Sequence, residues 1–206
     1  MNSSSRLEQS QHDEESAQQD TSPARRRRLR LALLSAVIMV SALLLDQLTK
    51  EWAIRELAER SIPMLPTTSL GLVYNPGVAF GIGSELGPAL SIGLFAVVLA
   101  MIGLLAVCVA RGRRLGLILP LALVIGGAAG NVFDRVFRIT ASGGPFSGHV
   151  VDFLAIEWFA VFNLADVFTV GGVLLGVALY LAHERADERA FNDATASSAK
   201  PPQPTE

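Results

Sequence analysis

The chain has 206 residues, of which 50% are hydrophobic and 17% are charged, and its mean hydropathy is +0.41. Soluble domains carry about 25% charged residues, so this composition argues against a soluble domain and indicates a polytopic membrane protein. A net charge of −2 offers no basic surface for nucleic acid. The single cysteine and three scattered histidines show no metal-ligand spacing, and we expect neither a metal nor another cofactor.

The N-terminal segment, residues 1–28, is rich in Ser, Gln, Glu and Asp and ends in the basic run Arg25–Arg28. Because it has few large apolar residues to bury, we expect a disordered tail. An apolar stretch at about 31–49 follows directly. A basic cluster before a short apolar run is also typical of a cleaved signal peptide. No small-x-small cleavage site follows, so the sequence favours a retained first membrane span.

Three further apolar stretches are each near the roughly 20 residues that a helix needs to cross a bilayer. They lie at about 88–110, 115–133 and 159–182. We therefore expect a four-helix membrane domain over residues 29–183 and a second disordered tail over 184–206.

Basic residues predict the orientation of these spans. They cluster before the first span, between the second and third, and after the fourth, at Arg25–Arg28, Arg111–Arg114, and Arg185 and Arg189. With four spans, all three clusters fall on one side of the membrane, which predicts that both termini are cytoplasmic. Basic residues also occur in the opposite loops, so the bias is moderate.

The segment between the first two spans is too long for a tight turn. Its part Ser69–Phe80 mixes β-branched and aromatic residues and contains the turn signal Asn75-Pro76-Gly77. The fold class expected is thus an all-α membrane protein with four transmembrane helices and a small extramembrane β-cradle between helices one and two. Asn75 is either a turn residue or an amide that reaches into a site.

Four acids from separate parts of the chain are predicted to meet at the outer membrane face. They are Asp46, Asp134, Asp152 and Asp166, at or near the outer ends of the spans. Ionisable groups at the edge of a membrane span are costly and indicate function. Two neighbouring carboxylates can share one proton, so that one is a base while the other stays protonated. Such a pair can activate water.

Polar partners accompany three of these acids at helical spacing. The partners are Lys50, four residues after Asp46, Asn131, three before Asp134, and Asn163, three before Asp166; Arg135 lies four residues after Asn131 on the same face. A purely structural interpretation, as helix caps and interfacial salt bridges, remains open for the first two groups. It is weaker for Asn163 and Asp166, because they lie in an apolar run where an uncompensated carboxylate is costly.

A proton- or cation-coupled transporter is the rival interpretation, since membrane carboxylates also serve as relays. Transporters are expected to spread such acids through the bilayer and to contain inverted repeats. Here the acids are predicted at one face and no repeat is visible.

Five motifs in chain order carry a resemblance to a known family. They are Asp46-x-x-x-Lys50, Asn75-Pro76-Gly77-Val78-Ala79-Phe80-Gly81, Gly130-Asn131-Val132-Phe133-Asp134-Arg135, Val150-Val151-Asp152-Phe153 and Phe162-Asn163-Leu164-Ala165-Asp166. From about Leu31 to Tyr180 the chain resembles the lipoprotein signal peptidases (signal peptidase II). The link from Asp134 to Asp152 is longer than the family pattern, by roughly Arg138–Ser147, and the link from Asp152 to Asp166 is shorter.

The resemblance implies a membrane aspartic endopeptidase that cleaves diacylglyceryl-modified prolipoproteins just before the lipidated Cys. It assigns the catalytic pair to Asp152 and Asp166, a choice that spacing alone leaves open against Asp134. Supporting positions around the substrate map to Asp46, Lys50, Asn75, Asn131, Asp134, Arg135 and Asn163. The expected setting is the bacterial cytoplasmic (inner) membrane, with the active site at the outer face. The expected partners are prolipoproteins and membrane lipid, and the expected state is a monomer.

Overall fold

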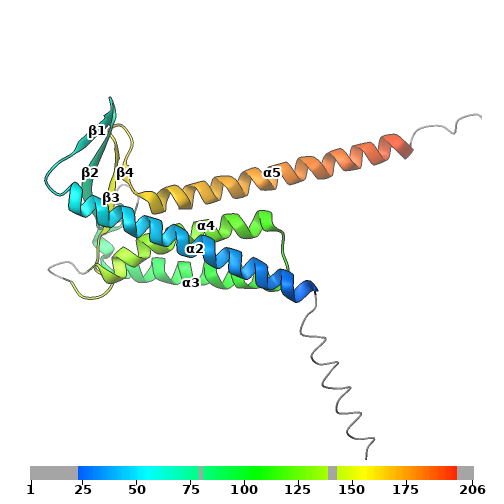
Figure 1. Cartoon of the computed structure of the whole chain (residues 1–206), viewed down its shortest axis with the longest axis horizontal. Coiled ribbons are helices and arrows are strands. Elements are labelled where there is room, and N and C mark those ends of the chain that lie inside the picture. Colours follow the sequence, from blue (N-terminus) through cyan, green and yellow to red (C-terminus); the bar gives the residue numbers. More distant parts are fainter. Residues whose placement is uncertain (1–22, 79–80, 139–142, 199–206) are drawn as a thin grey trace, which may run out of the picture.

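The computed structural model describes residues 23–78, 81–138 and 143–198, with side chains as far as residue 192. Four long helices run through these ranges (Figure 1). They are α2 (Pro23–Glu56), α3 (Pro88–Ala110), α4 (Leu115–Phe137) and α5 (Leu164–Ser198), and a short 3-10 helix, η2 (Ser84–Leu86), precedes α3. Each long helix is apolar enough over a sufficient length to cross a membrane. The predicted four-helix architecture is thus confirmed.

Two of the helices extend beyond the predicted spans. With 34 and 35 residues, α2 and α5 are each about 50 Å long at 1.5 Å per residue, whereas the hydrocarbon core is about 30 Å thick. The predicted disorder is therefore wrong for residues 23–28 and 184–198, which are helical. The Ala, Arg and Glu residues in these segments are strong helix formers even without an apolar face to bury. The rest of both predicted tails lies outside the described residues.

An antiparallel sheet with strand order β1-β2-β3-β4 lies at one end of the bundle. Its strands are β1 (Ile62–Leu65), β2 (Thr68–Asn75), β3 (Val150–Ile156) and β4 (Val161–Phe162). The β1–β2 hairpin is the cradle predicted between the first two membrane helices. Strands β3 and β4 come from the connection between α4 and α5, and β4 lies in residues that were predicted to belong to the fourth span. That helix begins at Leu164, not at residue 159, because the residues before it belong to the sheet.

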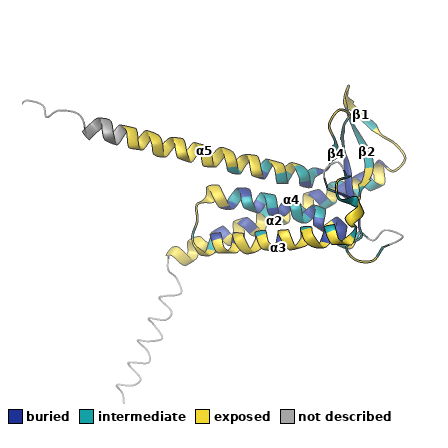
Figure 2. Ribbon diagram, turned by 180° about the vertical axis from the view of Figure 1, so that it is seen from behind, coloured by how far each residue is buried: buried dark blue, intermediate teal, exposed yellow. Residues whose placement is uncertain are grey.

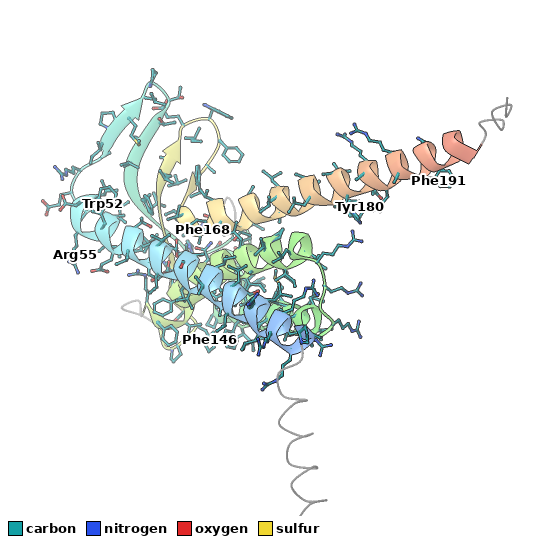
Figure 3. The ribbon with its side chains drawn as sticks, turned by 45° about the vertical axis from the view of Figure 1, so that its right-hand side comes forward. Trp52, Arg55, Phe146, Phe168, Tyr180 and Phe191 are labelled. Carbon is teal, nitrogen blue, oxygen red and sulfur yellow. The ribbon has the colours of Figure 1, made fainter. Side chains whose placement is uncertain are left out.

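The sheet is anchored on the end of α2. Phe153 of β3 packs in one cluster with Ala53 and Leu57, and its ring meets that of Trp52 edge-on with centroids 6.4 Å apart. Figure 3 shows Trp52 on this end of α2, close beneath the strands. Strand β3 is buried along its first four residues, so the acid it carries, Asp152, is held between the sheet and the helices.

Helix α4 forms the centre of the bundle. Ile118, Ala122 and Ile125 are fully buried along it. In Figure 2 much of α4 is buried or intermediate, whereas the outer length of α5 is exposed. Small residues permit close approach on two sides: a Cβ on Gly126 would lie 2.9 Å from Ala42 Cβ of α2, and one on Gly127 would lie 2.5 Å from the carbonyl oxygen of Ala165 of α5. These two glycines therefore allow α4 to pack closely against both α2 and α5.

Two adjacent glycines of α5 provide a matched test of this packing. A Cβ on Gly172 would lie 2.7 Å from Val124 Cγ2 and 3.0 Å from the carbonyl oxygen of Pro120 on α4, whereas a Cβ on Gly171 meets no atom within 4 Å. Gly172→Ala should lower the free energy of unfolding by about 1–3 kcal/mol through overpacking. Gly171→Ala should raise it by up to about 1 kcal/mol, the gain in helix propensity. Thermal unfolding in detergent measures both. Equal effects of the two changes would contradict the close α4–α5 contact.

Candidate active site

Lys50 of α2 lies at the base of the site. Its Nζ is 2.8 Å from Asp46 Oδ2, 2.8 Å from Asp134 Oδ2 and 2.9 Å from Asn131 Oδ1. The side chains of Lys50, Asp46 and Asp134 are all fully buried. Taking ions out of water is costly unless each is paired and hydrogen-bonded, and here the three ammonium protons have three acceptors.

The two acids of this cluster also bind backbone from distant segments. Asp46 Oδ1 accepts the N–H of Ala165 at 2.9 Å, and Asp134 Oδ2 accepts the N–H of Val151 at 3.2 Å. These bonds connect α2 and α4 to the start of α5 and to β3. The cluster therefore positions the two segments that carry Asp152 and Asp166.

Asp166 lies in the first turn of α5 and is held at both oxygens. Asn163 precedes the helix, and its backbone N–H donates to Asp166 Oδ2 at 3.0 Å, while the N–H of Asp166 donates to Asn163 Oδ1 at 3.2 Å. This reciprocal pattern is a capping box, and a carboxylate in the first turn interacts favourably with the helix dipole. The other oxygen, Oδ1, accepts from Asn131 Nδ2 at 2.7 Å.

Asp152 lies on β3, opposite Val73 of β2, and is only 3% exposed. Its Oδ2 accepts from Asn75 Nδ2 at 3.0 Å and its Oδ1 from Asn163 Nδ2 at 2.6 Å. Burial raises the pKa of the Asp152 carboxyl to about 6; the two amide hydrogen bonds oppose this rise, and the nearby charge of Asp166 adds to it. Asp152 thus keeps a proton at a higher pH than an ordinary aspartate does.

Asparagine side chains join the two acids to the buried ion cluster. Asn163 contacts both Asp152 and Asp166, and its Nδ2 also donates to Asn131 Oδ1 at 3.0 Å. Asn131 in turn binds Lys50 and Asp166. The two acids and the buried cluster therefore form one continuous hydrogen-bonded network.

Asn75 is more than a turn residue. Its Oδ1 accepts the N–H of Gly77 at 3.0 Å, which shapes the turn, while its Nδ2 reaches Asp152. Both alternatives left open by the sequence are thus observed in one side chain.

Arg135 does not pair with Asp134. Its NH1 donates to the carbonyl of Asn131 at 3.1 Å, and its NH2 donates to the carbonyl of Gly77. Its guanidinium, only 4% exposed, thereby fastens the turn that follows Asn75 onto α4. The structure thus brings all nine residues singled out by the sequence into one region; residues 79–80 of the Asn75 motif and 139–142 of the long link lie outside the described residues.

Two residues of the network escaped the sequence analysis. Arg138 Nε lies 2.7 Å from Asp134 Oδ1, and Gln47 Nε2 donates to Asp46 Oδ2 at 3.1 Å and to Asp134 Oδ1 at 3.2 Å. The i,i+4 spacing from Asp134 could have indicated Arg138, which the sequence analysis assigned to the extra link. Gln47 follows Asp46 directly, and adjacent helical positions carry no such signal.

Comparison with known proteins identifies the family. A family model described as "Signal peptidase (SPase) II" matches residues 38–182. The chain belongs to the signal peptidase II family. Its four apolar helices make it a multi-pass membrane protein.

Named relatives agree with this membership. A lipoprotein signal peptidase of Mycolicibacterium smegmatis is 41% identical over 170 residues, covering 78% of this chain and 65% of the relative. One of Mycobacterium tuberculosis is 37% identical over 172 residues, covering 79% of this chain and 77% of the relative. The chain thus spans slightly under two thirds of the first relative's length.

Two solved structures described as bacterial membrane enzymes share the fold. One has a TM-score of 0.56 at 26% sequence identity, with 72% of this chain and 92% of that chain covered. The other has a TM-score of 0.58 at 24% identity, with 84% and 94% covered. The fold of this chain thus covers nearly the whole of both solved structures.

Removing the cation from the buried ion cluster of this signal peptidase II member should strongly destabilise the protein. Lys50→Met leaves Asp46 and Asp134 buried without their cation, which should lower the free energy of unfolding by about 3–5 kcal/mol. Arg55→Gln is the matched control on the same helix: it removes a 2.8 Å pair with Glu51 whose arginine is 73% exposed, and it should cost at most about 1 kcal/mol. Thermal unfolding in detergent compares them. Similar losses in the two variants would contradict the structural role of Lys50.

Proposed function

We propose that this chain is a membrane aspartic endopeptidase that removes the signal peptide from diacylglyceryl-modified prolipoproteins, cutting before the lipidated Cys. The observation that carries the proposal is the placement of Asp152 and Asp166, two acids from different elements that share the partner Asn163. The family and the printed names of the relatives support the substrate class.

The environments of the two acids differ, which suggests how they divide the chemistry. Asp152, buried on β3 with a pKa of about 6, is assigned as the acid that holds the shared proton. Asp166 lies at the positive end of α5, and its carboxyl group accepts two hydrogen bonds, from the backbone N–H of Asn163 and from Asn131 Nδ2. It is assigned as the base. The two groups titrate as a pair rather than independently.

The reaction then balances its protons. Asp166 takes a proton from water, and the resulting hydroxide attacks the scissile carbonyl carbon while Asp152 gives its proton to the carbonyl oxygen. When the C–N bond of the tetrahedral intermediate breaks, Asp166 gives its proton to the leaving amine. Asp152 recovers its proton from the intermediate, and both acids return to their starting states.

The remaining polar residues act as positioning groups in this proposal. Lys50, Asp46 and Asp134 are fully buried, so they hold the helices and strands that carry the acids and do not touch substrate. Asn75 and Asn163 orient the Asp152 carboxyl through their amides. A neutral amide forms only a weak bond to a carboxyl group in either protonation state. The proton of Asp152 is therefore free to move.

We further propose that the site faces the outer side of the bacterial cytoplasmic membrane, with both termini in the cytoplasm. The basic clusters at the other ends of the helices support this orientation. Asp166 lies in the first turn of a membrane helix and Asp152 on the strand above it, at the depth where a lipid-anchored cysteine would enter. One chain supplies every residue of the network described above, which supports a monomer as the active unit.

The test is cleavage by the purified full-length chain of a diacylglyceryl-modified prolipoprotein beside the same substrate without lipid. Only the lipidated form should be cut. Asp152→Asn and Asp166→Asn should each retain less than about 1% of wild-type activity, because each removes a group that moves a proton. Both variants must keep the wild-type unfolding temperature. Full cleavage by either folded variant would overturn the catalytic pair, and cleavage of both substrates would overturn lipid recognition.

The pH dependence tests the assignment of Asp152. As pH rises through about 6, Asp152 loses its proton, so kcat/KM should fall on the alkaline side of the profile. Asn75→Ala removes an amide hydrogen bond that lowers the pKa of Asp152, so this falling limb should move to higher pH. Tyr74→Phe, an exposed neighbour on β2, is the control and should leave the profile in place. An unmoved limb in Asn75→Ala would refute the assigned role.

A further inference from the structure

A cavity of about 600 Å³ lies between α2 and α3, far from the catalytic acids. Ala32 and Ala36 of α2 and Ala106 and Ala110 of α3 are among the residues that line it. Because these side chains are small, they leave space unfilled between the two helices, which lie side by side in Figure 1. The volume is within the range of about 300–1,000 Å³ that small-molecule sites occupy.

The cavity lies in the half of the membrane opposite the catalytic pair. Arg28, at its mouth, is eighteen residues before Asp46 on one continuous helix, which places the two about 27 Å apart along the axis. That distance is close to the thickness of the hydrocarbon core, about 30 Å. The apolar part of the cavity is therefore at acyl-chain depth, and its arginine end is at headgroup depth.

The lining is apolar along the body of the cavity and basic at one end. Its body is apolar, with Leu29 and Val40 of α2 and Ile102 of α3 exposed at 58%, 53% and 38%. Its end is lined by Arg25 and Arg28, near the start of α2. An apolar slot that ends in two arginines matches an acyl chain joined to a phosphate, because the arginine fork binds phosphate oxygens with two parallel hydrogen bonds.

We propose that this cavity binds an anionic phospholipid of the leaflet opposite the active site, with one acyl chain between α2 and α3 and its phosphate on Arg25 and Arg28. A signal peptide is a poorer occupant, since its basic N-terminal region would meet these arginines. A neighbouring arginine keeps the mouth in shape: Arg27 donates to the carbonyl oxygens of Gly112 at 2.9 Å and Arg113 at 3.4 Å, just beyond the end of α3.

Native mass spectrometry of the full-length chain in detergent tests the proposal. Phosphatidylglycerol and phosphatidylcholine with the same acyl chains are titrated separately. The wild type should bind one phosphatidylglycerol roughly tenfold more tightly than phosphatidylcholine, the preference expected from two arginines beside an anionic headgroup. The double variant Arg25→Gln/Arg28→Gln should lose this preference. Ala36→Phe/Ala106→Phe, which fills the slot, should weaken binding of both lipids.

Arg26→Gln/Arg30→Gln is the matched control, because it removes the same charge from the same helix at positions that do not line the cavity. It should keep the preference for phosphatidylglycerol. Equal losses in the two arginine double variants would overturn the proposal in favour of diffuse attraction to anionic lipid. A wild type that binds neither lipid, or that forms a dimer which excludes them, would also overturn it. Each variant is compared at an unchanged unfolding temperature, and no readout depends on peptidase activity.

Discussion

The buried ammonium of Lys50 between Asp46 and Asp134 is the interaction on which the rest of the structure depends. In a bilayer there is no water to compensate three ions, so they persist only if each finds partners within the protein. They do so by drawing in backbone N–H groups from Ala165 and Val151. The electrostatic requirement of one cluster thereby fixes where α5 begins and where β3 crosses the helices. A membrane helix pair and an extramembrane sheet are thus joined at one point.

Asn163 has the corresponding role for the acids themselves. It caps α5 through its side-chain oxygen and backbone N–H, and its amide group reaches Asp152 on the neighbouring strand. One residue therefore sets the orientation of both carboxyl groups. The two acids remain chemically distinct, because one lies in a buried strand and the other at the positive end of a helix. That asymmetry is what a pair needs in order to divide the roles of acid and base.

The two membrane faces of the protein follow different physical rules. At the catalytic face, the ammonium of Lys50 is buried and paired with Asp46 and Asp134 within the protein. At the opposite face, arginines lie at the ends of apolar helices, where the headgroups of lipids can meet their charge. The long exposed stretch of α5 in Figure 2 belongs to neither, and its apolar surface is of the kind that acyl chains cover.

Membrane class, the number of spans, a small sheet between the first two spans and the pairing of Asp46 with Lys50 were all readable from the sequence, because hydropathy, β-branched residues and i,i+4 spacing are local signals. The position of the hairpin turn was not, because it lies between Leu65 and Thr68 and not at Asn75-Pro76-Gly77. The β3–β4 strands were not, since short, mostly apolar segments near the start of a helix read equally well as strand or as part of a span. The helical ends beyond the membrane were missed because their polar composition also suits a disordered tail. Only the tertiary structure decided that Asp134 pairs with Lys50 and Arg138 and not with Arg135, and that Asn163 joins the two acids. Such contacts connect residues far apart in the chain, and their geometry exists only once α2, α4, α5 and the sheet have packed together.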